Sequence, residues 1–274
     1  MLGAGRRRQG LMLGAWLASL SGVAVAGMCN TPALEALAGV ERSQWEEFDA
    51  QGRSLVRERG TLRVSGLQAS GRCRTADWAA QWTRSQGPRA YDGVTTAQAP
   101  LQTQSQLRAQ ALTFSAWLPL RENWAVGSQW GYSQIERSIA SSSRALGYPE
   151  RFSYWQLALG ARYQTVLSEQ VRLTASGWLG GGPGGRVAVD LPRADPVTLS
   201  LGNSRLLAVN LQLNGGVQDQ SGWSWQAGVF YRREQTHAGA PTVLIRNGVP
   251  VGAALQPRFV QQHLGTTASF SYRF

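Results

Sequence analysis

The side chains of this sequence best suited to acid–base chemistry are two histidines and three aspartates in polar stretches of the chain. The histidines are His237 and His263, and the aspartates are Asp92, Asp190 and Asp195. A histidine within hydrogen-bond reach of a carboxylate can act as a general base and activate water for hydrolysis. These five residues are therefore candidates for a hydrolytic site, and the alternative is that they are solvated residues without a catalytic role.

The sequence predicts neither a metal centre nor a cofactor site. Two histidines without a convergent group of carboxylates do not have the pattern of a zinc site. The glycines of "GWLGGGPGGR", residues 177–186, lack the spacing of a phosphate-binding loop and indicate a mobile loop. Any chemistry must therefore come from the protein's own side chains.

The first 26 residues have the organisation of a signal peptide. Arg6, Arg7 and Arg8 form a basic region, an apolar stretch covers residues 11–23, and residues 24–26 read "AVA", the form of a cleavage site. The apolar stretch is short for a membrane-spanning helix, which favours cleavage over an uncleaved anchor. We therefore expect an exported protein.

Composition points to a membrane rather than to nucleic acid. All 27 basic residues are arginine, against 16 acidic residues, and the formal net charge is +11. In an exported chain this balance favours anionic lipid or lipopolysaccharide as the partner. Charged residues are only 16% of the chain, below the roughly 25% of soluble domains. Because no later apolar run approaches the ~20 residues of a helical span, these features favour strands that face lipid on one side.

Apolar and polar residues alternate with a period of two along much of the chain. In residues 124–136, Trp124, Val126 and Trp130 share one face and Gln129 lies on the other. The same pattern recurs in residues 153–167, 207–217 and 223–234. Alternation of this length indicates strands, and the polar face carries glycine and amides. The sequence predicts an all-β fold, a transmembrane antiparallel β-barrel, closed because lipid does not tolerate an open sheet edge.

Short turns and long polar loops also alternate, as in bacterial outer-membrane barrels whose short turns face the periplasm. Ten strands account for the spacing, with about eight or twelve as the alternatives. They are expected near residues 43–49, 54–69, 75–86, 105–118, 123–137, 151–167, 170–180, 203–217, 223–235 and 259–274. The aromatic face ending at Phe274 resembles the C-terminal signal read by the barrel-assembly machinery.

The exported chain is expected to consist of a periplasmic segment, residues 27–42, and the barrel, residues 43–274. In the segment, "NTPALEALAGVE" predicts a short helix with Thr31 as its N-cap. Cys29 lies in this segment and Cys73 in a predicted periplasmic turn. In an oxidising compartment such a pair favours one disulfide that attaches the helix beneath the barrel. Two unpaired cysteines are the alternative.

Three stretches resemble the omptins, ten-stranded outer-membrane proteases of Gram-negative bacteria. They are "WAVGSQWGYSQIER" at 124–137, "LGYPERFSYWQLALGARYQ" at 146–164 and "TTASFSYRF" at 266–274. The resemblance covers most of residues 40–274 through spacing and short patches. It implies a ten-stranded barrel in the outer membrane, with basic residues on the outer wall that bind lipopolysaccharide.

The omptin catalytic pattern is not preserved. That family places an aspartate pair across a cleft from an Asp–His pair, and the two together activate water. The first pair would fall in "GPRAYDGVTTAQAP", which offers only Asp92, and the second in "GGRVAVDLPRADP", which has Asp190 and Asp195 but no histidine. We therefore expect a non-proteolytic surface barrel whose external loops bind a partner or serve a structural role. A surface hydrolase of peptides or lipids with a rearranged Asp/His site is the alternative.

The arginines divide into two predicted groups. In one group, the alternation of inward and outward positions along each strand (parity) directs the side chain into the lumen. These arginines are expected to pair with carboxylates and fill the interior, which disfavours a diffusion pore. They are Arg57, Arg59, Arg63, Arg162, Arg172 and Arg232. The omptin resemblance makes Arg137, Arg144 and Arg151, near one external loop, candidates for lipopolysaccharide binding, and the alternative for each is a solvated loop charge.

Overall fold

The computed structural model describes most of the chain. The residues described are 32–73, 75–94, 99–143, 145–192, 194–216 and 222–274. The predicted signal peptide, Cys29 and Arg144 lie outside them. Among the described residues no helix is long and apolar enough to cross a bilayer.

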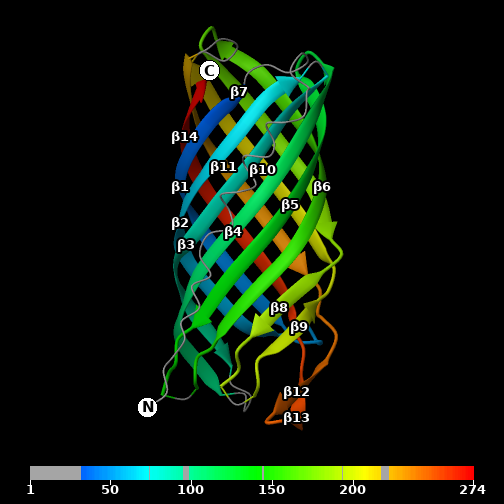
Figure 1. The fold of residues 1–274 in the computed structure, drawn as a ribbon. Coiled ribbons are helices and arrows are strands. Elements are labelled where there is room, and N and C mark those ends of the chain that lie inside the picture. The colour runs from blue at the N-terminus through cyan, green and yellow to red at the C-terminus, as the bar shows by residue number, and fades with distance from the viewer. Residues whose placement is uncertain (1–31, 74, 95–98, 144, 193, 217–221) are drawn as a thin grey trace, which may run out of the picture.

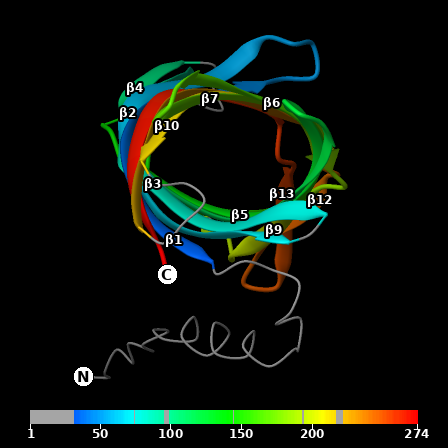
Figure 2. The same cartoon turned by 90° about the horizontal axis from the view of Figure 1, so that it is seen from above.

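Ten long antiparallel strands form a closed barrel, as predicted (Figures 1 and 2). The strands are β1 (Ala33–Phe48), β2 (Ser54–Cys73), β3 (Ala76–Val94), β4 (Pro100–Arg121), β5 (Trp124–Ile139), β6 (Pro149–Ser168), β7 (Val171–Gly182), β10 (Ser204–Gly216), β11 (Gly222–Thr236) and β14 (Arg258–Arg273). β1 pairs with both β2 and β14, and β5 pairs with both β4 and β6, so the ring has no open edge. Closure satisfies the backbone of every barrel strand.

The first strand corrects the sequence prediction of a helix. From Ala33 onward, the stretch expected to be helical is strand β1, which runs to Phe48 and begins well before the predicted barrel start. Ala33 pairs with Arg273 on one side and with Ser70 on the other. Without this strand, β2 and β14 would each leave an unpaired edge, and that requirement overrides the local helix signals.

The two ends of the barrel differ in their connections. At the C-terminal end, β1 begins, β14 ends, and the connections described are as short as the two residues between β6 and β7. The opposite end, the loop end, carries the longer connections (Figure 1). Four short strands lie there: β8 (Gly185–Val189) and β9 (Val197–Leu201), which extend the sheet from β6, and the separate hairpin β12 (Thr242–Arg246) and β13 (Val249–Ala254). Asn247 and Gly248 both have positive φ and form the tip of that hairpin.

The outer wall near the C-terminal end is apolar with an aromatic belt, as the alternation predicted. Trp223 contacts Tyr272, and Tyr272 contacts Phe274, with ring centroids 5.1 Å apart in each pair. Trp124 packs on Tyr163 at 5.0 Å on another part of the wall. Amphipathic aromatic rings of this kind mark the membrane boundary of outer-membrane barrels.

A second aromatic group lies further toward the loop end and defines an apolar band. Trp155 stacks between Trp130 and Tyr132, with centroid distances of 4.6 and 4.2 Å. Tyr163 follows Trp155 on the same strand by eight residues, a rise of roughly 26 Å along the strand and about 20 Å of depth at the usual tilt. The band between the two groups is therefore slightly shorter than the ~25 Å apolar band of typical outer-membrane barrels.

Beyond this band the polarity of the two faces reverses. On β4, Leu112 and Phe114 face outward within the band, whereas toward the loop end the outward positions are Gln104 and Arg108, and Leu107 is buried inside. The outer wall there is polar and the interior apolar. This reversal corrects the prediction for three arginines, because Arg57, Arg59 and Arg63 face outward from β2. The same parity correctly directs Arg162, Arg172 and Arg232 into the lumen.

Candidate functional site

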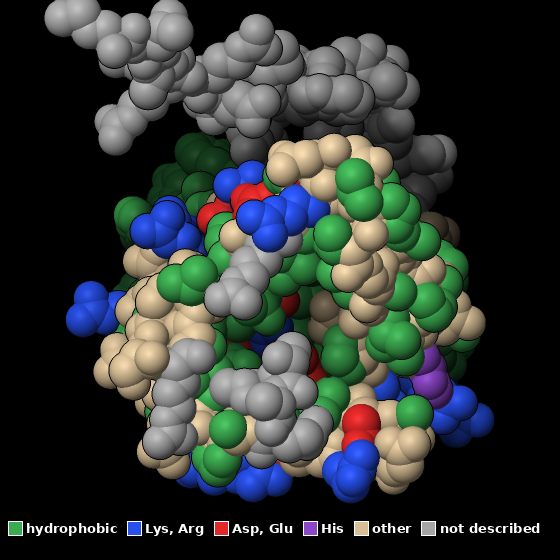
Figure 3. Space-filling view, turned by 90° about the horizontal axis from the view of Figure 1, so that it is seen from below, with side chains coloured by type: hydrophobic (Ala, Val, Ile, Leu, Met, Phe, Trp, Pro, Cys, Tyr) green, Lys and Arg blue, Asp and Glu red, His purple; other side chains and the backbone are tan. Residues whose placement is uncertain are grey.

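An aromatic and aliphatic cluster fills the lumen at the loop end, and we call it the loop-end plug. Trp45 is fully buried, stacks on Phe259 at 4.4 Å and meets Phe152 edge-on at 5.1 Å. Other buried members come from the barrel wall and the short strands β8 and β9: Leu62, Leu107, Ile135, Tyr154, Val187, Val189, Leu199 and Leu201. The plug closes this end of the barrel. Figure 3 looks onto that end and shows hydrophobic side chains mixed with basic and other residues around a central hollow.

Two arginines and three glutamates are buried beside the plug. The Arg137 guanidinium lies 2.7 Å from Glu47, 2.5 Å from Glu150 and 3.1 Å from Glu58. Arg89 lies 2.7 Å from Glu58. All five side chains are nearly inaccessible to solvent, so the pairs compensate charges that burial would otherwise make very costly.

Hydrogen bonds connect this charged group to the plug. Ser105 Oγ donates to Glu58 over 2.6 Å, and Trp45 Nε1 donates to Glu47 over 2.9 Å. The Arg137 guanidinium carbon also lies 4.7 Å from the Trp45 ring centroid, a cation–π contact. The loop end is therefore held by one connected set of charged and aromatic side chains.

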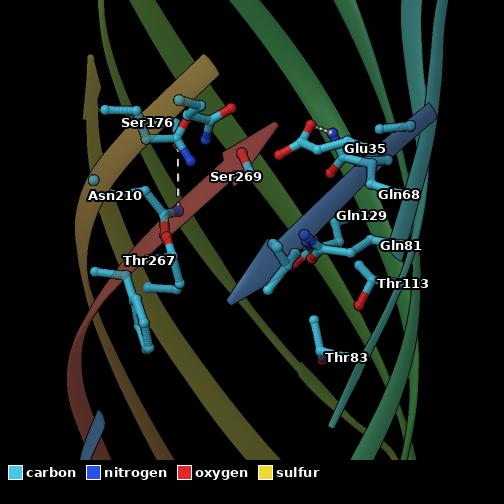
Figure 4. A pocket seen from close by; sticks show the side chains of 18 of the residues that line it. Glu35, Gln68, Gln81, Thr83, Thr113, Gln129, Ser176, Asn210, Thr267 and Ser269 are labelled. Atoms are coloured by element: carbon cyan, nitrogen blue, oxygen red, sulfur yellow. Dashed lines mark hydrogen bonds between the residues drawn. The ribbon is translucent and has the colours of Figure 1, made fainter. Parts of the chain in front are cut away.

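On the C-terminal side of the plug the lumen is open, so the prediction of a filled interior holds only at the loop end. A cavity of about 570 Å³ extends from the plug toward the C-terminal end. Its lining comes from all ten barrel strands and is rich in amides and hydroxyls (Figure 4). Examples from opposite walls are Gln68, Gln81, Gln129, Asn210 and Thr267. Near the C-terminal end, Asp77 pairs with Arg72 and Arg162.

The inner end of this cavity, next to the plug, is a cluster of polar side chains. Arg232 donates to Gln156 over 2.7 Å and pairs with Glu234 at 3.2 Å, and Tyr154 donates to Glu234 over 3.3 Å. Gln261 lines the same end and is only 4% exposed. The group combines donors and acceptors in a nearly dry environment, where hydrogen bonds are strong.

His263 also lies at this inner end, paired with a carboxylate that sequence reasoning did not associate with it. Its Nδ1 atom is 3.1 Å from Glu41 Oε1, and both residues line the cavity. Ser43, the strand partner of His263 on β1, is fully buried, and its Oγ has no hydrogen-bond partner among the described residues. A histidine oriented by a carboxylate is a general-base arrangement.

The other hydrolytic candidates are not brought together. Asp92 faces outward from β3, and Asp190 and Asp195 are exposed between β8 and β9. His237 is exposed just after β11, where its backbone N–H donates to the carbonyl of Asn203. Among the described residues no three His, Cys, Asp or Glu side chains form a metal-binding group. Catalysis by these residues stays a prediction.

The lipopolysaccharide candidates also separate. Arg137 is 2% exposed and inside the lumen, so it is not available on the outer wall, and that part of the prediction is wrong. Arg151 is exposed, 3.8 Å from Glu136. Arg144 lies outside the described residues.

Solved structures of outer-membrane barrels are similar to this chain. The outer-membrane protease OmpT from Escherichia coli matches with a TM-score of 0.56 and 14% identity, covering 89% of this chain and 97% of that one. The translocator domain of the autotransporter NalP from Neisseria meningitidis covers 88% of each chain at 14% identity, with a TM-score of only 0.44. No protein-family profile and no curated protein sequence matches the chain. The fold is an omptin-like barrel.

Sequence reasoning missed most of the interior of this omptin-like barrel. Glu58, Arg89 and Glu150 were not singled out, although each stands between exposed outward neighbours on its strand. The available signal was the alternation itself, with Glu58 in phase with Leu62 on β2. A charged residue in phase with a run of buried aliphatic residues indicates a buried ion pair.

Proposed function

We propose that this omptin-like barrel lies in the outer membrane of a Gram-negative bacterium, with its short turns in the periplasm and its loop end outside the cell. The apolar band with aromatic groups at both borders supports the location. The long connections at one end support the orientation. We further propose that it is a non-proteolytic surface protein whose external loops bind a protein partner.

The observation that carries this proposal is the hairpin β12–β13 at the loop end. Four β-branched apolar side chains, Val243, Ile245, Val249 and Val251, are between 44% and 60% exposed on it. Such a group beyond the membrane is unfavourable in water and marks an interaction surface. Arg246 stands beside the tip, and the chain is strongly basic, so the partner that fits is a protein with an apolar patch and acidic surroundings.

Two measurements test this proposal. An epitope inserted after Gly248 should be bound by antibody on intact cells. Labelling of lysed cells without labelling of intact cells would overturn the orientation. Refolded protein supplied with lipopolysaccharide should not cleave fluorogenic peptides above background. Turnover abolished by Asp92→Ala or His263→Ala would show that the protein is a protease and reverse the proposal.

A hydrolase is the second candidate, favoured by the contact of His263 Nδ1 with Glu41 Oε1. This pair lies inside the lumen rather than at the surface, so its substrate would have to enter the cavity. Hydrolysis of small esters that disappears in both His263→Ala and Glu41→Gln, in variants that both remain folded, would support it.

Two further predictions concern the C-terminal end. The Cys29–Cys73 disulfide is supported by the pairing of Ala33 with Ser70, which brings the start of β1 close to Cys73 in the sheet. Faster migration of unreduced than of reduced denatured protein on a gel is expected.

Recognition by the assembly machinery is supported by the outward placement of Phe270 and Phe274, and Phe274→Ser should slow assembly.

A further inference from the structure

The lumen cavity is a pocket closed at one end. The loop-end plug blocks it on one side, and lining residues such as Ala33, Ser271 and Arg273 place its opening at the C-terminal end. Its volume, about 570 Å³, falls within the range of small-molecule sites. A pore would need a path through the plug, where Trp45, Phe152 and Phe259 are in contact. The geometry is therefore that of a binding site rather than a channel.

Amide side chains project into the cavity without partners of their own. Gln81, Gln129, Gln212 and Gln226 line it from four different strands, and their side chains make no hydrogen bond to the described residues. Figure 4 shows Gln81 and Gln129 directed into the space together with Thr83. Each amide can both donate and accept.

The inner end holds buried polar atoms that are also unpaired. Gln261 Nε2 and Glu234 Oε1 are inaccessible to solvent and have no partner in good hydrogen-bond geometry among the described residues, although Tyr154 lies next to Gln261. Their side chains are 4% and 2% exposed and line the cavity. An unpaired buried donor beside an unpaired buried acceptor is costly in an empty site. If the two side chains rotate slightly toward the cavity, a ligand hydroxyl can accept from one and donate to the other.

Charge balance indicates that the ligand is uncharged. The acidic and basic residues of the lining are nearly equal in number, and Asp77, Glu234 and Glu41 each have a basic or histidine partner. The full set is Glu35, Glu41, Asp77 and Glu234, against Arg72, Arg162, Arg172, Arg232 and Arg273. A strongly anionic or cationic ligand would meet repulsion from one half of this set.

We propose that the cavity binds an uncharged oligosaccharide of two or three sugar rings, which enters from the C-terminal end. Sugar hydroxyls match the mixed donors and acceptors of the wall, and the terminal ring bonds Gln261 and Glu234. Trp117 and Trp178, whose rings lie 4.3 Å apart in the lining, are only 7% and 5% exposed, so the polar side chains of the wall carry the recognition. This proposal is independent of the external hairpin and of its partner.

The test is calorimetric titration of the refolded full chain in a detergent without a sugar head group. Maltotriose and triacetylchitotriose are the two probes, since a neutral glucan and an acetamido glycan represent different periplasmic sources. Saturable binding of either probe at one molecule per barrel supports the site, and the tighter probe identifies the source. Binding of neither at millimolar concentration overturns the proposal, as does binding of charged dipeptides alone.

A matched pair of variants locates the site. Gln261→Leu removes the buried amide and should weaken binding about tenfold, the consequence of one lost buried hydrogen bond. Gln262→Leu, the next residue on β14 but on the outer face, should change binding less than about twofold. Equal effects of the two variants, in barrels that both remain folded by gel mobility, would contradict the site. Gln81→Ala, which leaves the inner end intact, should weaken binding by a smaller factor.

Discussion

The half of the barrel near the C-terminal end and the half near the loop end use the same strands with opposite polarity. In the first, Leu112 and Phe114 of β4 face outward and Thr113 faces the cavity; in the second, Gln104 faces outward and Leu107 is buried. One half is therefore an inside-out membrane structure, and the other has an interior like that of a soluble protein. The medium outside the wall, lipid or water, decides which face is apolar.

The difference also separates two ways of stabilising a barrel interior. The C-terminal half contains a polar cavity whose amides are left for solvent or ligand. The loop-end half contains the plug, in which Arg137 is fully enclosed by Glu47, Glu58 and Glu150. Substitutions at equivalent depths in the wall should therefore have unequal consequences in the two halves.

The largest effect is expected from breaking the buried charge group of the loop-end half. Arg137→Met removes the cation shared by three glutamates and should lower the free energy of unfolding by about 3–5 kcal/mol, because uncompensated charges remain buried. Urea unfolding of the refolded barrel, followed by gel mobility, measures it.

Arg162→Met provides the comparison from the C-terminal half. Arg162 pairs with Asp77 beside the open cavity, where water can replace the lost partner. Its effect should be well below that of Arg137→Met. Equal losses in the two variants would mean that the halves do not differ in this way.

A charge placed on the outer wall tests the location of the membrane. Leu211→Arg, on the apolar band of β10, should destabilise the barrel by about 2–4 kcal/mol in lipid. Gln104→Arg, on the polar wall of the loop-end half, should change stability by less than about 0.5 kcal/mol. Unfolding in vesicles measures both. If Leu211→Arg left the stability unchanged, Leu211 would not lie in the part of the wall that faces the membrane core.

Packing inside the C-terminal half is expected to respond to a single methyl group. An added Cβ at Gly160 would lie 2.5 Å from Trp178 and 2.7 Å from the Gly177 carbonyl oxygen, whereas at Gly131 the nearest atom is 3.8 Å away. Gly160→Ala should therefore cost about 1–3 kcal/mol through overpacking. Gly131→Ala is the control and should be nearly neutral in the same unfolding measurement.

The sequence predicted the closed ten-stranded barrel because alternation and turn spacing are local properties. It failed at β1, where the helix-like pattern of residues 33–41 was local but the need for a strand between β2 and β14 was not. The pairing of the first strand with the last follows only from the complete set of strands in the closed ring. The connection between the strands predicted at residues 43–49 and 54–69 lies where expected, and Gly52 supplies a positive φ there.

The candidate site was predicted only in part. His263 was named as a candidate from its residue type, but its partner Glu41 lies 222 positions earlier in the chain, and no local pattern links them. Parity misplaced Arg57, Arg59 and Arg63 because it assumed an apolar exterior along the whole strand. The reversal of polarity beyond the membrane band inverts that rule, although the same period of two persists.

The smallest effect is expected at the turn between β1 and β2, outside the membrane. Asp49 accepts the backbone N–H of Gln51 and Arg53 over 2.9 and 2.8 Å and pairs with the Arg53 side chain at 2.6 Å. Slight desolvation raises the pKa of Asp49, but the hydrogen bonds and charge of Arg53 outweigh it and hold the pKa below its ordinary value of 3.8. Because the folded pKa is the lower one, this turn is stabilised above pH 3.8 and the contribution is lost as the pH falls through the folded pKa.

The amide proton shifts of Gln51 and Arg53, followed by NMR during acidification, report this titration directly. Their common midpoint should lie below pH 3.8, the ordinary pKa of an aspartate. Asp49→Asn keeps an acceptor for the two amides but removes the charge, so it should abolish the titration while the turn persists. A midpoint at or above the ordinary value would show that Arg53 does not hold the carboxylate in solution and that this turn contributes no stability that depends on its ionisation.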